Sequence, residues 1–136
     1  GWCLGVPPQA DSQLALPVNA LEAEEDTEGL WRHFVNRALT QYQPLFDHVA
    51  FWVMLQAPSF DCVYAWRLEQ EQKLAAKATD GDAVMTAEQV ARFIAFYQRL
   101  TEWGFTTVPD RVDYLFTLDE KRAIQGVTQP CTEGRL

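Results

Sequence analysis

One short apolar run constrains the fold of this chain more than any other feature. Residues 50–55 read Ala-Phe-Trp-Val-Met-Leu, an unbroken apolar run rich in strand formers, and Pro58 ends it. A run of this kind is typical of a strand that is covered on both faces, as in a parallel sheet. Parallel neighbours need a crossover connection between them, so the run predicts a layered α/β fold.

Amphipathic helices are predicted on either side of this strand. Apolar residues recur at helical spacing over residues 30–43, where Pro44 is expected to end the helix and Asp26 or Thr27 to cap it. A second helix is expected from Ser59 or Asp61 towards residue 77, with Glu69 and Lys73 at the stabilising i,i+4 spacing.

A third helix and two more strands complete the predicted elements. Thr86 and Gln89 have the spacing of a capping box, and the helix that they open is expected to end at Gly104. Residues 113–118 and 124–127 read as strands joined by a polar turn. Two or three strands form a small sheet with uncovered edges, so we expect partner strands outside this chain.

Composition and charge narrow the classes of function. The chain has 136 residues, enough for one compact unit, and a net charge of -8 without any Lys/Arg cluster along the sequence, which argues against a nucleic-acid partner. A local group of donors still permits an anion such as ATP. No apolar run is long enough for a membrane helix, and three widely separated cysteines fit a reducing cytoplasm.

Common catalytic signatures are missing from these residues. The sequence has no GxxxxGK[ST], GxGxxG, GxSxG or HExxH motif. The acidic residues 22–28 are interpreted as a solvated loop rather than a Mg²⁺ site, and Asp80 to Asp82 as a turn rather than a calcium loop. Arg67 carries a guanidinium, the donor best suited to phosphate oxygens, but the residues alone favour a surface ion pair with Glu71 at i,i+4.

Four segments, in this order, resemble the family of D-glycerate 3-kinases and related P-loop kinases. They are Gly-Trp-Cys-Leu-Gly at 1–5, Tyr-Ala-Trp-Arg-Leu-Glu-Gln-Glu at 64–71, Met-Thr-Ala-Glu-Gln-Val at 85–90 and Val-Asp-Tyr-Leu-Phe-Thr-Leu-Asp at 112–119. The resemblance implies a P-loop NTPase-like, three-layer α/β fold with a mostly parallel sheet that is incomplete in this chain. Residues 1–136 would be the C-terminal portion of a single kinase domain.

The resemblance also implies an activity and its participants. The complete protein would use ATP and Mg²⁺ to phosphorylate a hydroxyl group of a small molecule. Its phosphate-binding loop would lie in a missing N-terminal half, so we expect this chain alone to be inactive, because phosphoryl transfer depends on that loop for positioning and charge stabilisation.

Within this chain the resemblance assigns roles to a few residues. Arg67 would reach the transferring phosphate as a catalytic residue, and Lys73 would be a weaker candidate for the same anion. Trp2 would lie near the acceptor, and the segment leading to Gly126 would lie near the adenine. These four residues are the candidate site.

A non-catalytic α/β module that binds a protein through an exposed aromatic patch is the alternative hypothesis. The two hypotheses predict different sheets. The kinase predicts parallel strands with an open sheet edge beside Gly1, whereas a closed sheet with every edge paired or covered would count against it.

Overall fold

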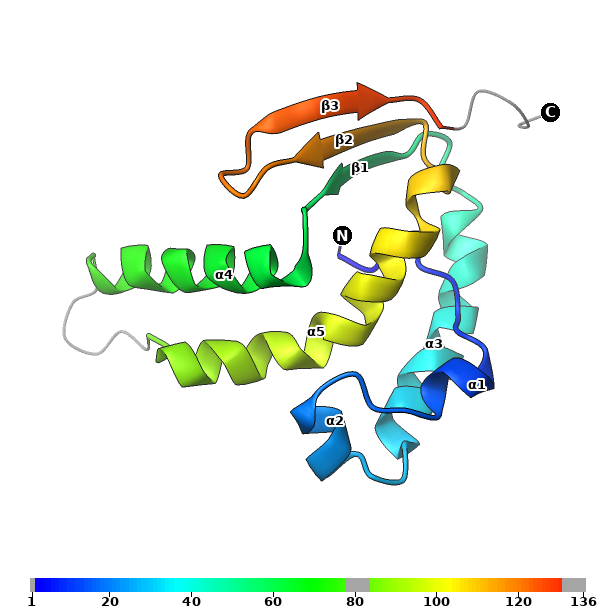
Figure 1. The fold of residues 1–136 in the computed structure, drawn as a ribbon. Coiled ribbons are helices and arrows are strands. Elements are labelled where there is room, and N and C mark those ends of the chain that lie inside the picture. The colour runs from blue at the N-terminus through cyan, green and yellow to red at the C-terminus, as the bar shows by residue number, and fades with distance from the viewer. Residues whose placement is uncertain (1, 78–83, 131–136) are drawn as a thin grey trace.

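A computed structural model describes residues 2–77 and 84–130 of the chain (Figure 1). Its sheet has three strands, β1 (Val53–Gln56), β2 (Tyr114–Leu118) and β3 (Ile124–Thr128). The α-helices are α1 (Asp11–Leu14), α2 (Ala20–Glu25), α3 (Leu30–Phe46), α4 (Phe60–Ala75) and α5 (Ala87–Thr107), and a 3-10 turn at Pro109–Arg111 leads into β2.

The sheet is mixed rather than mostly parallel. Its order is β1-β2-β3, with β1 and β2 parallel and β2 and β3 antiparallel. A short turn joins β2 to β3, and strands joined so closely can pair only as a hairpin. Asp119 builds this turn, because its Oδ1 accepts hydrogen bonds of 2.8 Å from the amides of Lys121 and Ala123. The expectation of parallel order holds only for the first two strands.

Among residues 2–77 and 84–130, the helices lie on one face of the sheet and leave the other face bare (Figure 1). Met54 and Leu115 are register partners that belong to the core under the sheet. Their neighbours Val53 and Leu55 point the opposite way and are 51% and 64% exposed. The described residues therefore form two layers, where three were expected for the complete fold.

The edge of the sheet at β1 is open. Within the described residues β1 pairs with β2 alone, so its second edge carries free backbone groups. Gly1 lies outside the described residues, but Trp2 lines a pocket together with Val53 and Leu55 of this strand. An open edge of a parallel strand pair is the arrangement that the kinase hypothesis predicts.

The core joins the sheet to α3 and α5. It is built from apolar side chains of the N-terminal segment, both helices, the connection from α5 to β2, and β2 itself, namely Val6, Leu39, Leu100, Val108, Val112 and Leu115. Helix α5 passes Gly104 and ends only at Thr107. Gly104 is buried, and a Cβ there would lie 3.3 Å from a methyl of Val6, so this glycine allows close packing rather than ending the helix.

Local sequence signals predict where the helices start better than where they end. Ser59 caps α4 and Thr86 caps α5 in a capping box with Gln89, as predicted. Helix α3 runs through Pro44 to Phe46, so the prediction that Pro44 ends it is wrong. Its N-cap is Gly29, although the Asp26 carboxylate still accepts hydrogen bonds from the amides of residues 31 and 32.

Two buried arginines fix the irregular N-terminal segment. Arg99 of α5 donates to the backbone carbonyl of Leu16 at 2.7 Å and pairs with Glu22. Arg32 of α3 donates to the carbonyl of Leu14 at 2.7 Å and pairs with Asp26. The acidic run is therefore only in part a solvated loop. Residues 22–25 belong to α2 and two carboxylates hold this segment against the helices, whereas Glu24, Glu25 and Glu28 are exposed.

Candidate functional site

A groove between α4 and the β2-β3 turn brings basic side chains together. It has a volume of about 490 Å³ and is lined by Val63, Trp66, Arg67, Glu69, Gln70, Lys73 and Arg122. We call it the α4-turn groove. It lies at the carboxyl end of β2, on the side of the sheet from which β1 leads into α4 (Figure 1). Ligands of open α/β sheets bind at the carboxyl ends of their strands.

Trp66 anchors the turn to the helix. Its indole Nε1 donates a hydrogen bond of 2.7 Å to the backbone carbonyl of Glu120, and the guanidinium carbon of Arg122 lies 5.7 Å from the centre of its ring. Arg122 has a positive φ of 68°, which ends the turn and directs the chain into β3. The position of Arg122 over α4 is thus set by contacts within the protein.

Glu69 is the anion of this groove. Its carboxylate pairs with Lys73 one turn along α4 and, at 2.5 Å, with Arg122 of the turn. The hydrogen bond from Lys73 and the one from Arg122 hold the pKa of Glu69 below its usual value. The predicted i,i+4 spacing of Glu69 and Lys73 is confirmed, and the structure adds a second cation to the pair.

Arg67 lies between α4 and α5. It forms an ion pair with Glu71, and its guanidinium carbon lies 5.6 Å from the ring centre of Phe93. The ion pair expected from the sequence is confirmed, but it is no surface pair, because the Glu71 side chain is only 6% exposed. Glu71 also accepts a hydrogen bond of 3.1 Å from the amide of Met85.

One donor group of Arg67 has no acceptor within the described residues. Its Nη1 is buried and has no hydrogen-bond partner. A buried guanidinium nitrogen without a partner is unfavourable. The catalytic role predicted for Arg67 remains a prediction.

The other two candidate residues lie outside this groove. Trp2 is half exposed, and its Nε1 donates a hydrogen bond of 2.8 Å to Thr101 in an apolar pocket between β1 and α5. Gly126 lies in β3 beside Thr117, where a Cβ would approach the Thr117 hydroxyl to 3.2 Å. Close strand packing explains this glycine, and the adenine contact assigned to its segment stays a prediction.

The structure thus unites Arg67 and Lys73 and adds Arg122, which the sequence did not single out. Arg122 is more than fifty positions away from Trp66 along the chain, and the polar turn that holds it carries no motif. A correct prediction would have needed the pairing of β1 with β2, which brings the turn to α4.

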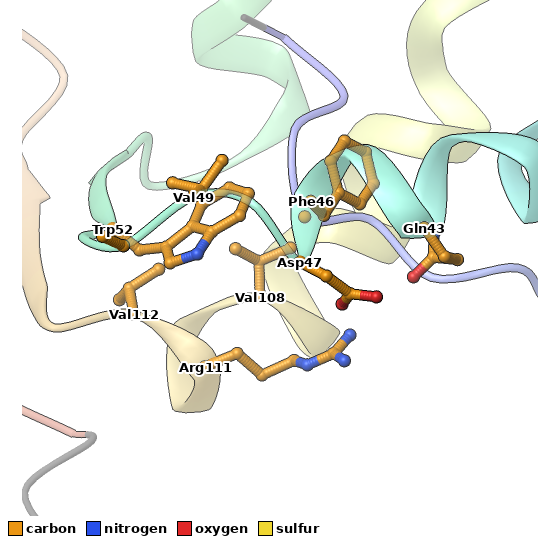
Figure 2. Close-up of a pocket in the computed structure, with 10 residues that line it drawn as sticks. Gln43, Phe46, Asp47, Val49, Trp52, Val108, Arg111 and Val112 are labelled. Carbon is orange, nitrogen blue, oxygen red and sulfur yellow. The ribbon is translucent and has the colours of Figure 1, made fainter. Parts of the chain in front are cut away.

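A second polar pocket lies at the opposite end of the strands, where β1 and β2 begin (Figure 2). It has a volume of about 430 Å³, and its lining includes residues that directly precede β1 and β2. Asp47 and Arg111 project into it, beside the packed rings of Phe46 and Trp52. No candidate residue from the sequence belongs to it, and it is remote from the strand ends where α/β enzymes bind substrates.

Comparison with known proteins gives a family resemblance. No protein-family model matches the sequence. A D-glycerate 3-kinase from Cryptococcus neoformans matches 95% of this chain with a TM-score of 0.69 and 28% identity. The resemblance to D-glycerate 3-kinases is confirmed. An uncharacterized kinase of Schizosaccharomyces pombe, mug58, is 34% identical over 123 residues, which are 89% of this chain.

A further structural neighbour shares the fold. The structure of the YGR205w protein matches 98% of this chain with a TM-score of 0.62 and 23% identity. In each case the match covers only part of the relative: 38% of the mug58 kinase, 48% of the D-glycerate 3-kinase and 47% of the YGR205w protein. The chain therefore spans less than half the length of the relatives that it matches.

Two further observations concern membrane-spanning helices and metal sites. No helix among them has both the length and the apolar character needed to cross a membrane. Within residues 2–77 and 84–130 no group of three His, Cys, Asp or Glu side chains is arranged to hold a metal ion. The predicted turn at Asp80 to Asp82 lies outside these ranges.

Proposed function

We propose that this chain is part of an ATP-dependent kinase that phosphorylates a hydroxyl group of a small molecule. The observation that carries the proposal is the match of nearly the whole chain to a D-glycerate 3-kinase, together with 34% identity to a second kinase. D-Glycerate is accordingly the first acceptor to test. Other small hydroxylated metabolites are the next.

The chain would be the C-terminal portion of one P-loop kinase domain with three layers. Support comes from surfaces that a complete α/β domain covers: the free edge of β1 and the bare sheet face with Val53 and Leu55. α/β sheets of mostly parallel strands are covered by helices on both faces. The segment that pairs with β1 would bring the phosphate-binding loop, and without it the chain is expected to be inactive.

The α4-turn groove fits the phosphate groups of ATP. Arg67 would contact the phosphoryl group in transfer and Lys73 the same polyphosphate, because guanidinium and ammonium groups stabilise phosphate charge. ATP supplies the phosphoryl group, and Mg²⁺ neutralises charge between its phosphates. The described residues offer no set of ligands for Mg²⁺. Trp2 would lie near the acceptor and the segment of Gly126 near the adenine.

The activity is tested on the longest protein that the gene of this chain encodes. We expect ATP-dependent phosphorylation of D-glycerate or of another small hydroxy compound, measured as ADP release and confirmed by mass spectrometry of the product. The 136-residue chain, assayed beside it, is expected to show no turnover. A folded longest product without phosphorylating activity on any hydroxylated metabolite would contradict the proposal.

The protein-interaction module keeps some support from one exposed surface. Trp31 and Phe34 of α3 stack with their ring centres 5.8 Å apart and are 54% and 56% exposed. Trp31 fits the apolar pattern of this helix, yet its ring lies at the surface and not in the core. If this patch carries the function, Trp31→Ser with Phe34→Ser abolishes partner binding and leaves any kinase activity unchanged.

A further inference from the structure

We propose that the α4-turn groove is a polyphosphate site in which Arg122 is the third cation, and in which Glu69 is an internal anion that phosphate displaces. The ligand class, the phosphates of a nucleotide, rests on the proposed kinase function. The site itself rests on charges and contacts of the described residues. The resemblance from which Arg67 was predicted placed the segment leading to Gly126 near the adenine, but it gave neither Arg122 nor Glu69 a phosphate contact.

The charges in the groove are opposite in sign to those of the chain. The whole protein carries a net charge of -8, yet three basic side chains and one acidic side chain line this groove. The three basic side chains come from two segments that are distant in the sequence, so the sequence itself contains no Lys/Arg cluster. A local excess of cations binds anions even where the global charge is negative.

Glu69 already occupies the place of an anion. Lys73 and Arg122 approach its carboxylate from the helix and from the turn, as they would approach two oxygens of a phosphate. All three side chains are between 38% and 68% exposed. Ion pairs as exposed as these contribute little and exchange partners easily, so a more highly charged anion can replace the carboxylate.

Two contacts prepare the cations for such an exchange. Trp66 holds the turn through Glu120 and packs against Arg122, so the guanidinium is in place before a ligand arrives. Glu71 pairs with one terminal nitrogen of Arg67, so this guanidinium is likewise held in place before a ligand arrives. Preorganised donors of this kind lower the entropy that binding costs.

The alternative explanation is that these residues only form a structural network and bind no anion. If Glu69 only ties the turn to α4, then removing either partner loosens the turn and weakens any anion contact. If Glu69 competes with the ligand, the two substitutions have opposite effects. Arg122→Ala should weaken anion binding, and Glu69→Gln should strengthen it.

The test titrates inorganic tripolyphosphate into the 136-residue chain and follows amide chemical shifts by NMR. We expect shifts in α4 and in residues 119–123. The dissociation constant should rise about fivefold in Arg122→Ala and fall about fivefold in Glu69→Gln, which corresponds to about 1 kcal/mol each way. Spectra of the free variants show whether the fold is retained.

Glu25→Gln is the matched control. Glu25 is a half-exposed carboxylate that pairs with Arg92 of α5, so its removal changes the net charge equally but away from the groove. Its effect on the dissociation constant should be small. The proposal is overturned if Glu69→Gln binds tripolyphosphate no more tightly than Glu25→Gln, or if Arg122→Ala binds it like the unchanged chain.

The same titration with ATP separates this site from the proposed function. Shifts in the groove with both ligands support a nucleotide phosphate site. If tripolyphosphate binds there and ATP does not, the anion site stands and the nucleotide ligand is wrong. If neither ligand shifts groove residues while the longest gene product phosphorylates its acceptor, the kinase stands and the role of Arg122 and Glu69 fails.

Discussion

Glu22 shows how one carboxylate links stability to pH in this chain. Burial alone would raise its pKa, but hydrogen bonds from Arg99 and from the amide of Val18 outweigh burial and lower the pKa below 4.5. A carboxyl whose pKa is lower in the folded state stabilises the protein above its unfolded pKa, and this stabilisation is lost as the pH falls through the folded value.

Glu22→Gln should therefore reduce both stability and its dependence on pH. We expect a loss of about 2 kcal/mol in the free energy of unfolding at pH 7, because Arg99 keeps a buried charge without its partner. The loss should shrink as the pH falls below about 4.5. Urea denaturation at several pH values measures this, with the exposed Glu24→Gln as control; equal effects of the two variants would contradict the expectation.

Arg67 gives the residue-level test of the kinase site. In an active longest gene product, Arg67→Ala should lower kcat by about a hundredfold, because a donor to the transferring phosphate acts mainly in the transition state. Arg37→Ala on the exposed side of α3 is the control. Unchanged kcat in Arg67→Ala would leave the arginine as a structural partner of Glu71.

At the scale of elements, the start of α5 depends on its capping box. The Thr86 hydroxyl accepts a hydrogen bond of 3.2 Å from the amide of Gln89, whose side chain accepts one of 2.9 Å from the Thr86 amide. Thr86→Ala should cost about 1 kcal/mol of stability. Thermal unfolding measures it against Thr40→Ala in the exposed interior of α3, which should be neutral or slightly stabilising.

These helix starts were predictable because a cap is local. Thr86 and Gln89 are three residues apart, and the Ser59 cap likewise bonds within its own first turn. The ends were not predictable. Gly104 stays helical because its missing side chain admits Val6 from the N-terminal segment, a contact between distant parts of the sequence.

The contacts of the candidate site also divide into those that local sequence predicts and those that it does not. The pairs of Arg67 with Glu71 and of Lys73 with Glu69 follow from helical spacing, so the sequence predicted both. Arg122 reaches Glu69 only because β1 and β2 pair in parallel, which sets the turn after β2 above the helix after β1. Strand order is a tertiary property, and no local pattern around residue 122 encodes it.

At the scale of the whole molecule, the described residues leave one side of the sheet without a covering layer (Figure 1). The uncovered face carries apolar side chains from all three strands, and five residues of β1, β3 and the approach to β1 are half exposed or more: Phe51, Val53, Leu55, Ile124 and Val127. Contiguous apolar surface on this scale favours association in water. The net charge of -8 opposes it through mutual repulsion.

We therefore expect the 136-residue chain to self-associate through this face, and more strongly as salt screens its charge. Leu55→Thr combined with Val127→Thr should weaken the association, because threonine keeps the strand preference and removes apolar surface. Sedimentation velocity at low and high salt measures the association.

Leu16→Thr, at a residue 76% exposed in the N-terminal segment, is the matched control. If the control lowers association as much as the double variant, the sheet face is not the contact. If only the double variant lowers it, the chain associates through the face that a further layer of the domain would cover.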